Sequence, residues 1–318
     1  MKTVVGISNF SFESQRFTSF QQIQDQLAKL KSLQGKFDQY GVSLSIATDI
    51  LKNKYFGLSL ETQFNNFAFG KDKQNIIAFR SRLERGYFNG FNKKYTSEAL
   101  RKLASEPDEV GRVCCTLYAP TVLISGSSNF KSVEGFSSYY EDVLGKYPID
   151  ESSYYLRATS HFKNVLYHDD CNATLYRVPD GFCNYSIAIT KSLRALNILS
   201  PMSGNDIQKH LSDIATKAEY SCTPEGSSHE HFKFAFKFKG ADYPKLGCQF
   251  HIKPSDRNMK GDGSHNHKRI YFGFIPVDGD KLKIAVAAIG PHITTHNSSD
   301  RYAPERIKRK KVRNKGNS

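Results

Sequence analysis

HFKFAFKF, residues 231–238, is the first of four segments in which apolar and polar residues alternate. The others are CQFHIK (248–253), RIYFGFI (269–275) and KLKIAVAAI (281–289). A period of two residues is typical of β-strands that bury one face. Short turns between some of these segments favour an antiparallel β-meander, with its Phe- and Ile-rich face packed on helices.

The segments that precede this meander complete an α+β pattern. Residues 173–178 are expected to form a strand, which the turn signal Pro179-Asp180-Gly181 would end. Two helices then follow, one over about 184–199 and one that opens at Ser203. We therefore expect residues 171–300 to form an α+β domain in which two helices pack on the meander.

The first 150 residues are expected to form a separate, mainly helical domain of unknown role. Apolar residues recur every three or four positions in three stretches, which lie at 18–35, 72–85 and 97–104. Residues 112–125 are rich in Val, Leu, Ile and Thr and predict a short β section. The Gly- and Ser-rich stretch 125–138 is expected to be an exposed loop, and the domain boundary is expected between 150 and 170.

The composition points to a globular protein with an anionic partner. Hydrophobic residues make up 39% of the 318 residues and charged residues 24%, which is an ordinary balance for a folded chain. Lys and Arg number 45 against 31 Asp and Glu, so the net charge is +14. A basic excess of this size favours nucleic acid as a partner.

The segment 301–318 concentrates this charge. It holds eight Lys or Arg and one acid, Glu305, so its net charge of +7 is half that of the chain. Few apolar residues are present to anchor it, which predicts a flexible, disordered basic tail. We expect it to contact nucleic acid through Arg306, Lys308, Arg309, Lys310 and Lys311.

The sequence predicts a cytoplasmic protein without a membrane partner. The N-terminal residues MKTVVGI are followed by Ser8 and Asn9, too short an apolar stretch for a signal peptide. No run approaches the 18 or so apolar residues that a spanning helix needs. The six cysteines lack CxxC spacing, so we expect them to be reduced and mainly buried as packing residues.

Histidines and cations gather in the meander region. Seven of the ten histidines fall within residues 229–296. Alternation predicts one polar sheet face opposite the Phe and Ile face, with His292 at the end of the fourth strand. This face is expected to carry His231, Lys233, His251, Lys253, Arg269 and Tyr271.

Such a face suits RNA cleavage without a metal ion or other cofactor. The reaction needs a group that deprotonates the 2′-hydroxyl, charge stabilisation at phosphorus and a proton for the leaving oxygen. We expect His251 or His292 to move protons, and Lys253 with Arg269 to bind the phosphate. Tyr271 would donate a proton or stack on a base, while His231 and Lys233 would bind the nucleic acid.

The order of a strand, two helices and a β-meander with basic and aromatic residues is similar to the RelE/ParE-like toxin fold. Over residues 171–293, the strings HIK (251–253), RIYF (269–272) and IGPHI (289–293) also resemble uncharacterised bacterial toxin and phage-defence proteins. The resemblance implies a metal-independent endoribonuclease that acts with Lys, Arg, Tyr and His. An inhibitory protein partner is compatible with this class.

Two other classes of function remain open at this stage. Asp242 upstream of Gln249 and Lys253 imitates a metal-dependent DNA nuclease of the PD-(D/E)XK kind, although the strand itself offers no carboxylate. A zinc site from His265 and His267 would need a spaced quartet of ligands that the sequence lacks. The third class is a basic RNA- or DNA-binding module without catalysis.

Overall fold

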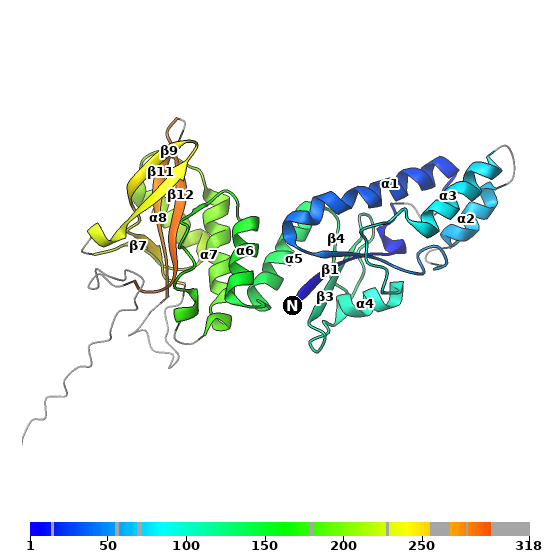
Figure 1. Cartoon of the computed structure of the whole chain (residues 1–318), viewed down its shortest axis with the longest axis horizontal. Coiled ribbons are helices and arrows are strands. Elements are labelled where there is room, and N and C mark those ends of the chain that lie inside the picture. Colours follow the sequence, from blue (N-terminus) through cyan, green and yellow to red (C-terminus); the bar gives the residue numbers. More distant parts are fainter. Residues whose placement is uncertain are drawn as a thin grey trace, which may run out of the picture. The chain divides into compact units, whose positions relative to one another are not determined.

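The protein is a mixed α+β chain that divides into two compact units (Figure 1). Unit 1 is Met1–Ile149 and unit 2 is Asp150–Ser318. The computed structural model describes residues 1–13, 16–54, 57–68, 72–178, 181–226, 229–254, 268–277 and 279–293. Structural statements below concern these residues.

Unit 1 contains a parallel sheet of four strands in the order β2-β1-β3-β4. The strands are β1 (Lys2–Ile7), β2 (Ser43–Ile46), β3 (Val113–Tyr118) and β4 (Asn129–Phe130). The expected β section is present as β3, but β1 and β2 were not expected. β1 (KTVVGI) shows no clear alternation because it is buried on both faces, and β2 (SLSI) has only four residues, which is too short a run to predict a strand.

Five helices of unit 1 lie in the described residues. They are α1 (Phe20–Phe37), α2 (Leu60–Phe67), α3 (Lys73–Arg85), α4 (Ser97–Ser105) and α5 (Val133–Lys146). The helices predicted over 18–35, 72–85 and 97–104 are confirmed as α1, α3 and α4. The apolar stripe of α1 is buried, and Ser19 caps its first turn by accepting a hydrogen bond from the Gln22 amide.

The stretch 125–138 is not a simple exposed loop. It contains β4 and the first turns of α5. Ser132 caps α5 by accepting a hydrogen bond from the Gly135 amide, and Phe136 is fully buried. Gly and Ser lower the local propensity for helix, but here a capping serine and buried aromatic residues outweigh that preference.

Unit 2 contains a largely antiparallel sheet in the order β5-β12-β11-β10-β7, with β6 beside β12. Only the β5–β12 pair within it is parallel. The strands are β5 (Leu166–Tyr167), β6 (Met202–Ser203), β7 (Cys222–Pro224), β10 (Phe250–Ile252), β11 (Lys268–Val277) and β12 (Lys281–Pro291). The expected antiparallel arrangement is confirmed for β10, β11 and β12.

One face of this sheet is covered by helices. Unit 2 has α6 (Glu151–His161), α7 (Ser186–Leu199) and α8 (Ile207–Ala218). The two expected helices are α7 and α8, and α8 starts at Ile207 because Asp206 caps it. His210 of α8 contacts the ring of Phe274 at 5.8 Å, and Phe274 lies with Phe250 and Phe272 on the same sheet face.

A separate hairpin covers the opposite face. It consists of β8 (Lys233–Phe238) and β9 (Ala241–Gly247), and it is not a strand of the meander. Positive φ angles at Lys239 and Gly240 allow a tight turn that returns the chain onto β8. The expectation that residues 231–238 begin the meander is therefore wrong, because they pair with residues 241–247 instead.

The hairpin packs its phenylalanines on the sheet. Phe232, Phe234 and Phe236 are buried in one cluster with residues of β11 and β12. In β12 the residues of this cluster are small, namely Ala285, Ala287 and Ala288, which leaves room for the phenyl rings. The sheet is thus a middle layer between helices and a hairpin (Figure 1).

The strand expected at 173–178 is absent from these residues. Leu175–Arg177 form a 3₁₀ turn, η3. The Thr174 hydroxyl donates a hydrogen bond of 2.8 Å to the Ile289 carbonyl, so the turn attaches to the end of β12. Gly290 lies against it, with φ +157°, and a Cβ there would meet Thr174 Oγ1 at 2.3 Å. The turn therefore depends on a tertiary contact.

We expect Gly273→Ala to destabilise unit 2 by about 1–3 kcal/mol, as overpacking generally does. A Cβ on Gly273 would lie 2.4 Å from the Gly247 carbonyl oxygen at the end of β9. That oxygen is backbone and cannot move aside without shifting the hairpin. Urea unfolding measures the change, and Gly247→Ala, where no atom lies within 4 Å of the added carbon, is the control. Equal stability of the two variants would contradict this packing.

Candidate functional site

His251 and Tyr271 are cross-strand neighbours. They are directly paired in the register of β10 and β11, and their ring centroids lie 5.4 Å apart. Lys253 and Arg269 are two residues further along these strands, so alternation places them on the same face. The sequence pattern thus brings together the four side chains that it predicted to share a face.

That face is buried rather than open to solvent. The exposed fraction of His251 is 3% and that of Tyr271 is 0%. Phe232 of the hairpin stacks on Tyr271 with 5.2 Å between ring centroids. The expectation of a polar outer face is wrong at these two residues. Tyr271 is covered by Phe232 and the hairpin phenylalanines, and His251 is enclosed next to Tyr271, Thr223 and Glu225. Tyr271 belongs to the core, where it cannot serve as an open stacking platform in this structure.

The hairpin also separates two predicted ligands from this face. Lys233 alternates with the buried Phe232 and Phe234, so it lies on the outward side of β8. His231 precedes it in the 3₁₀ turn η5 (His229–Phe232) and is half-buried. Neither residue joins His251 on the sheet face, contrary to the expectation, because residues 231–238 belong to the covering layer.

Glu225 was missed by the sequence analysis and lies between two histidines. Its Oε2 is 3.5 Å from His251 Nδ1 and 3.6 Å from His292 Nε2. We call these three residues the Glu–His cluster. Glu225 follows the three-residue strand β7, which pairs with β10. Thr223 and Glu225 are two residues apart, which in a strand puts them on one face. This short alternation was the available sequence signal for Glu225.

His292 reaches the cluster from the end of β12, as the sequence suggested. Its ring lies 6.2 Å from that of Tyr271, in a T-shaped arrangement. The side chains of His292 and Glu225 are 18% and 20% exposed, whereas that of His251 is 4% exposed. A ligand from solvent would therefore meet Glu225 and His292 before His251.

Burial, together with the positive charge of Arg269, lowers the pKa of His251 to about 3. Glu225 opposes this shift, while Lys253 and His292 add to it. His251 is consequently neutral at neutral pH. Its Nε2 lies 3.3 Å from Thr223 Oγ1, and its Nδ1 faces Glu225. Both ring nitrogens are thus oriented by protein groups.

The hydrogen bond with His292 lowers the pKa of Glu225, and the charge of His251 acts in the same direction. Burial works against this shift but does not outweigh it. Glu225 is therefore a carboxylate at neutral pH. An ionised carboxylate beside a neutral, oriented imidazole can accept a proton or fix a partner that carries one.

Two half-buried cations lie beside the cluster. Both Arg269 and Lys253 act electrostatically on His251. Arg269 is held at its backbone, where the Tyr185 hydroxyl donates a hydrogen bond of 3.3 Å to its carbonyl. Its Nη1 donates to the Lys268 carbonyl at 2.9 Å. These cations can bind the phosphate of a ligand that reaches Glu225 and His292.

Several predicted features lie outside the described residues. These are the tail with Arg306, Lys308, Arg309, Lys310 and Lys311, and the loop with His265 and His267. Within the described ranges, no group of three or more His, Cys, Asp or Glu side chains is arranged to hold a metal ion. Asp242 lies in β9 with its Oδ1 3.9 Å from the Lys237 ammonium.

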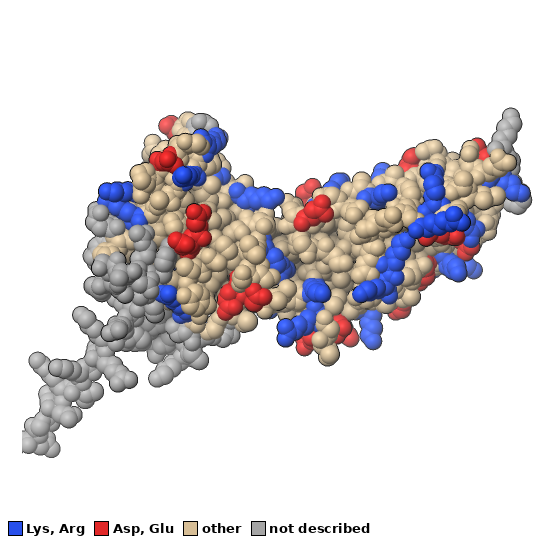
Figure 2. All heavy atoms as spheres, viewed as in Figure 1, with Lys and Arg blue, Asp and Glu red and all other residues tan. Residues whose placement is uncertain are grey.

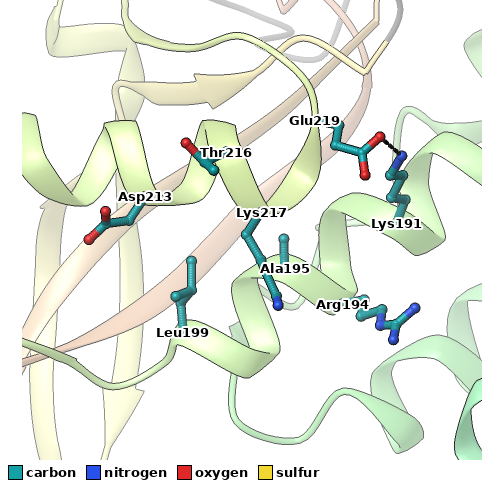
Figure 3. Close-up of a pocket in the computed structure, with 8 residues that line it drawn as sticks. All are labelled: Lys191, Arg194, Ala195, Leu199, Asp213, Thr216, Lys217 and Glu219. Carbon is teal, nitrogen blue, oxygen red and sulfur yellow. Dashed lines mark hydrogen bonds and ion pairs between the residues drawn. The ribbon is translucent and has the colours of Figure 1, made fainter.

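On the face shown in Figure 2, the charged residues do not gather in one patch. Figure 2 shows Lys and Arg scattered over the visible face of both units and interspersed with Asp and Glu. A second concave site lies between α7 and α8, with a volume of about 540 Å³. Lys191 and Glu219 form an ion pair at one end of it (Figure 3). Lysine, arginine and acidic side chains line this groove together. Its described lining does not contain a carboxylate in contact with imidazoles, as Glu225 is.

In the described part of the chain, no helix combines the length and apolar character that crossing a bilayer requires. The sequence matches no protein-family model, and no curated protein or solved structure matches it significantly.

Proposed function

We propose that unit 2 binds RNA and cleaves it without a metal ion at the Glu–His cluster. One observation carries this proposal: two imidazoles share one oxygen of an ionised carboxylate, beside Arg269 and Lys253. A proton acceptor, a proton donor and phosphate-binding cations are the groups that metal-free RNA cleavage requires. The cluster supplies all three types within one end of the sheet.

The positions of the side chains suggest how the tasks divide. His292 is the more exposed imidazole and is the better candidate for proton transfer. His251 is neutral, its Nε2 is held by Thr223 and its Nδ1 lies 3.5 Å from Glu225 Oε2, so it acts as a positioning residue for Glu225. Arg269 and Lys253 would stabilise the charge that develops on the phosphate. The strings HIK (251–253), RIYF (269–272) and IGPHI (289–293), which resemble toxin and phage-defence proteins, suggest a biological class for the proposed activity, a toxin or phage-defence effector.

A cleavage assay tests the proposal directly. Purified full-length protein is incubated with end-labelled RNA and, separately, DNA, each with and without EDTA. We expect RNA cleavage that survives EDTA, because the proposed groups are all side chains. His292→Gln should abolish it, whereas His161→Gln in α6 should not. Cleavage of DNA that EDTA abolishes would favour the metal-dependent nuclease instead.

A second candidate function is a binding module without catalysis. It is favoured by the burial of His251 and Tyr271, which leaves Glu225 and His292 as the partly exposed groups of the cluster. The same assay separates the two candidates. An electrophoretic shift of RNA without any cleavage would support the binding module and contradict the nuclease.

A further inference from the structure

The two oxygens of Glu225 have different surroundings. Oε2 is buried and lies within 3.6 Å of a nitrogen of each histidine. The side chain of Glu225 is 20% exposed, and this exposed part does not include Oε2. With Oε2 oriented by two imidazoles, Oε1 is the oxygen that can meet a hydroxyl group of a ligand.

The two proton transfers, one from the 2′-hydroxyl and one to the leaving 5′-oxygen, cannot be divided between the two histidines. The side chain of His251 is only 4% exposed, and with a pKa of about 3 it has no imidazolium proton to give near neutrality. Its Nε2 also faces Thr223 rather than the open side. Glu225 and His292 are then the two groups of the cluster that can accept and donate a proton near the phosphate-binding cations.

We infer that Glu225 is a catalytic residue, the base that takes the proton from the attacking 2′-hydroxyl of RNA. This inference rests on the proposed function. As the proton moves to the carboxylate, the 2′-oxygen bonds to phosphorus and the bond from phosphorus to the 5′-oxygen breaks. His292, in its imidazolium form, gives its proton to that 5′-oxygen. The products are a 2′,3′-cyclic phosphate and a 5′-hydroxyl, and the substrate class is RNA because DNA lacks the nucleophile.

The geometry also explains why a carboxylate can serve here. The neighbouring imidazoles, His292 above all, keep Glu225 ionised, so it is able to accept a proton at neutral pH. Arg269 and Lys253 would draw the scissile phosphate toward the same end of the sheet. Holding the base and the phosphate in one orientation lowers the entropy cost of the reaction.

Glu225→Gln tests the inference. We expect kcat for RNA cleavage to fall by roughly a hundred- to ten-thousand-fold, with a much smaller change in KM, because the amide cannot accept the proton. Glu219→Gln, which changes an ion-paired acid of the α7–α8 groove, is the control and should keep full activity. Formate should partly restore activity to Glu225→Ala, a rescue that a purely structural role would not give.

The cleavage products of the unsubstituted protein provide a second test, which needs no variant and so does not depend on how a variant folds. The upstream fragment should carry a 2′,3′-cyclic phosphate at its 3′ end. A single 2′-deoxynucleotide on the 5′ side of the scissile phosphate, which removes the attacking hydroxyl, should block the reaction. Cleavage at the deoxy-substituted site, or near-normal activity of Glu225→Gln, would overturn the role of Glu225 as the base. The proposal that the protein cleaves RNA would still stand. Absence of any RNA cleavage by the unchanged protein would instead remove the proposed function itself.

Discussion

Replacing Arg269 with alanine is expected to reduce RNA cleavage by roughly a hundred- to a thousand-fold, as the loss of a transition-state charge contact generally does. Arg269 is half-buried and close enough to His251 to be the largest charge effect on its pKa. A phosphate bound beside Glu225 and His292 would lie near the same guanidinium. Single-turnover cleavage of a defined RNA measures the effect on chemistry apart from binding.

Arg269→Lys sharpens this prediction. Lysine keeps the positive charge but cannot make the two parallel hydrogen bonds of a guanidinium with a phosphate. We expect an activity between those of the arginine and alanine forms. Arg194→Ala, a change on the exposed face of α7, is the matched control and should leave cleavage unchanged. Full activity of Arg269→Ala in folded protein would contradict the catalytic role of this end of the sheet.

The second large effect concerns the stability of unit 2 in acid. The pKa of His251 is about 3 in the folded protein, against an ordinary value of 6.5. The unfolded chain therefore binds a proton at a higher pH than the folded chain does. Stability is fully present above about pH 6.5 and falls as the pH decreases toward 3, by a total on the order of 4–5 kcal/mol from this residue.

Glu225 acts in the same direction at lower pH. Its folded pKa lies below the ordinary 4.5, so its contribution is present above pH 4.5 and is lost as the pH falls through the folded value. Urea unfolding from pH 7 down to about pH 3 measures both effects. Hydrogen exchange of the β10 and β11 amides assigns them to unit 2 rather than unit 1.

His251→Gln should flatten the pH dependence between 6.5 and 4.5, because glutamine does not titrate. His161→Gln in α6 is the control, and its pH dependence should match that of the unchanged protein. Arg269→Ala offers a third measurement: without that positive charge the pKa of His251 should rise, and acid should destabilise the fold less. An unaltered pH profile in His251→Gln would show that His251 does not control the acid stability.

The sequence by itself determined which residues share a face within a strand. Alternation alone placed His251 and Lys253 together on one strand, and Arg269 and Tyr271 together on the next. It also determined helices such as α3 and α7, whose apolar stripes have a period near 3.6. These features are local, since the geometry of a strand or helix fixes them within a few residues.

Only the tertiary structure decided which sheet face is covered, and by what. Residues 231–238 satisfy the strand pattern equally well as a meander strand or as one arm of a hairpin, and the tight turn at Lys239 and Gly240 selects the hairpin. Tertiary pairing also decided β1 and β2. Both are short segments, and they form strands because β1 pairs with β2 on one side and with β3 on the other.

Glu225 shows this limit at the candidate site. It follows a strand of three residues, too short for a pattern, and reaches His251 only because β7 pairs with β10. His292 reaches the same carboxylate from the end of β12, 67 residues along the chain from Glu225. Periodicity records the neighbours of a residue along its own strand, whereas a site built from three strands depends on the pairing of segments far apart in sequence. That pairing is set by the packing of the whole sheet between its helices and its hairpin.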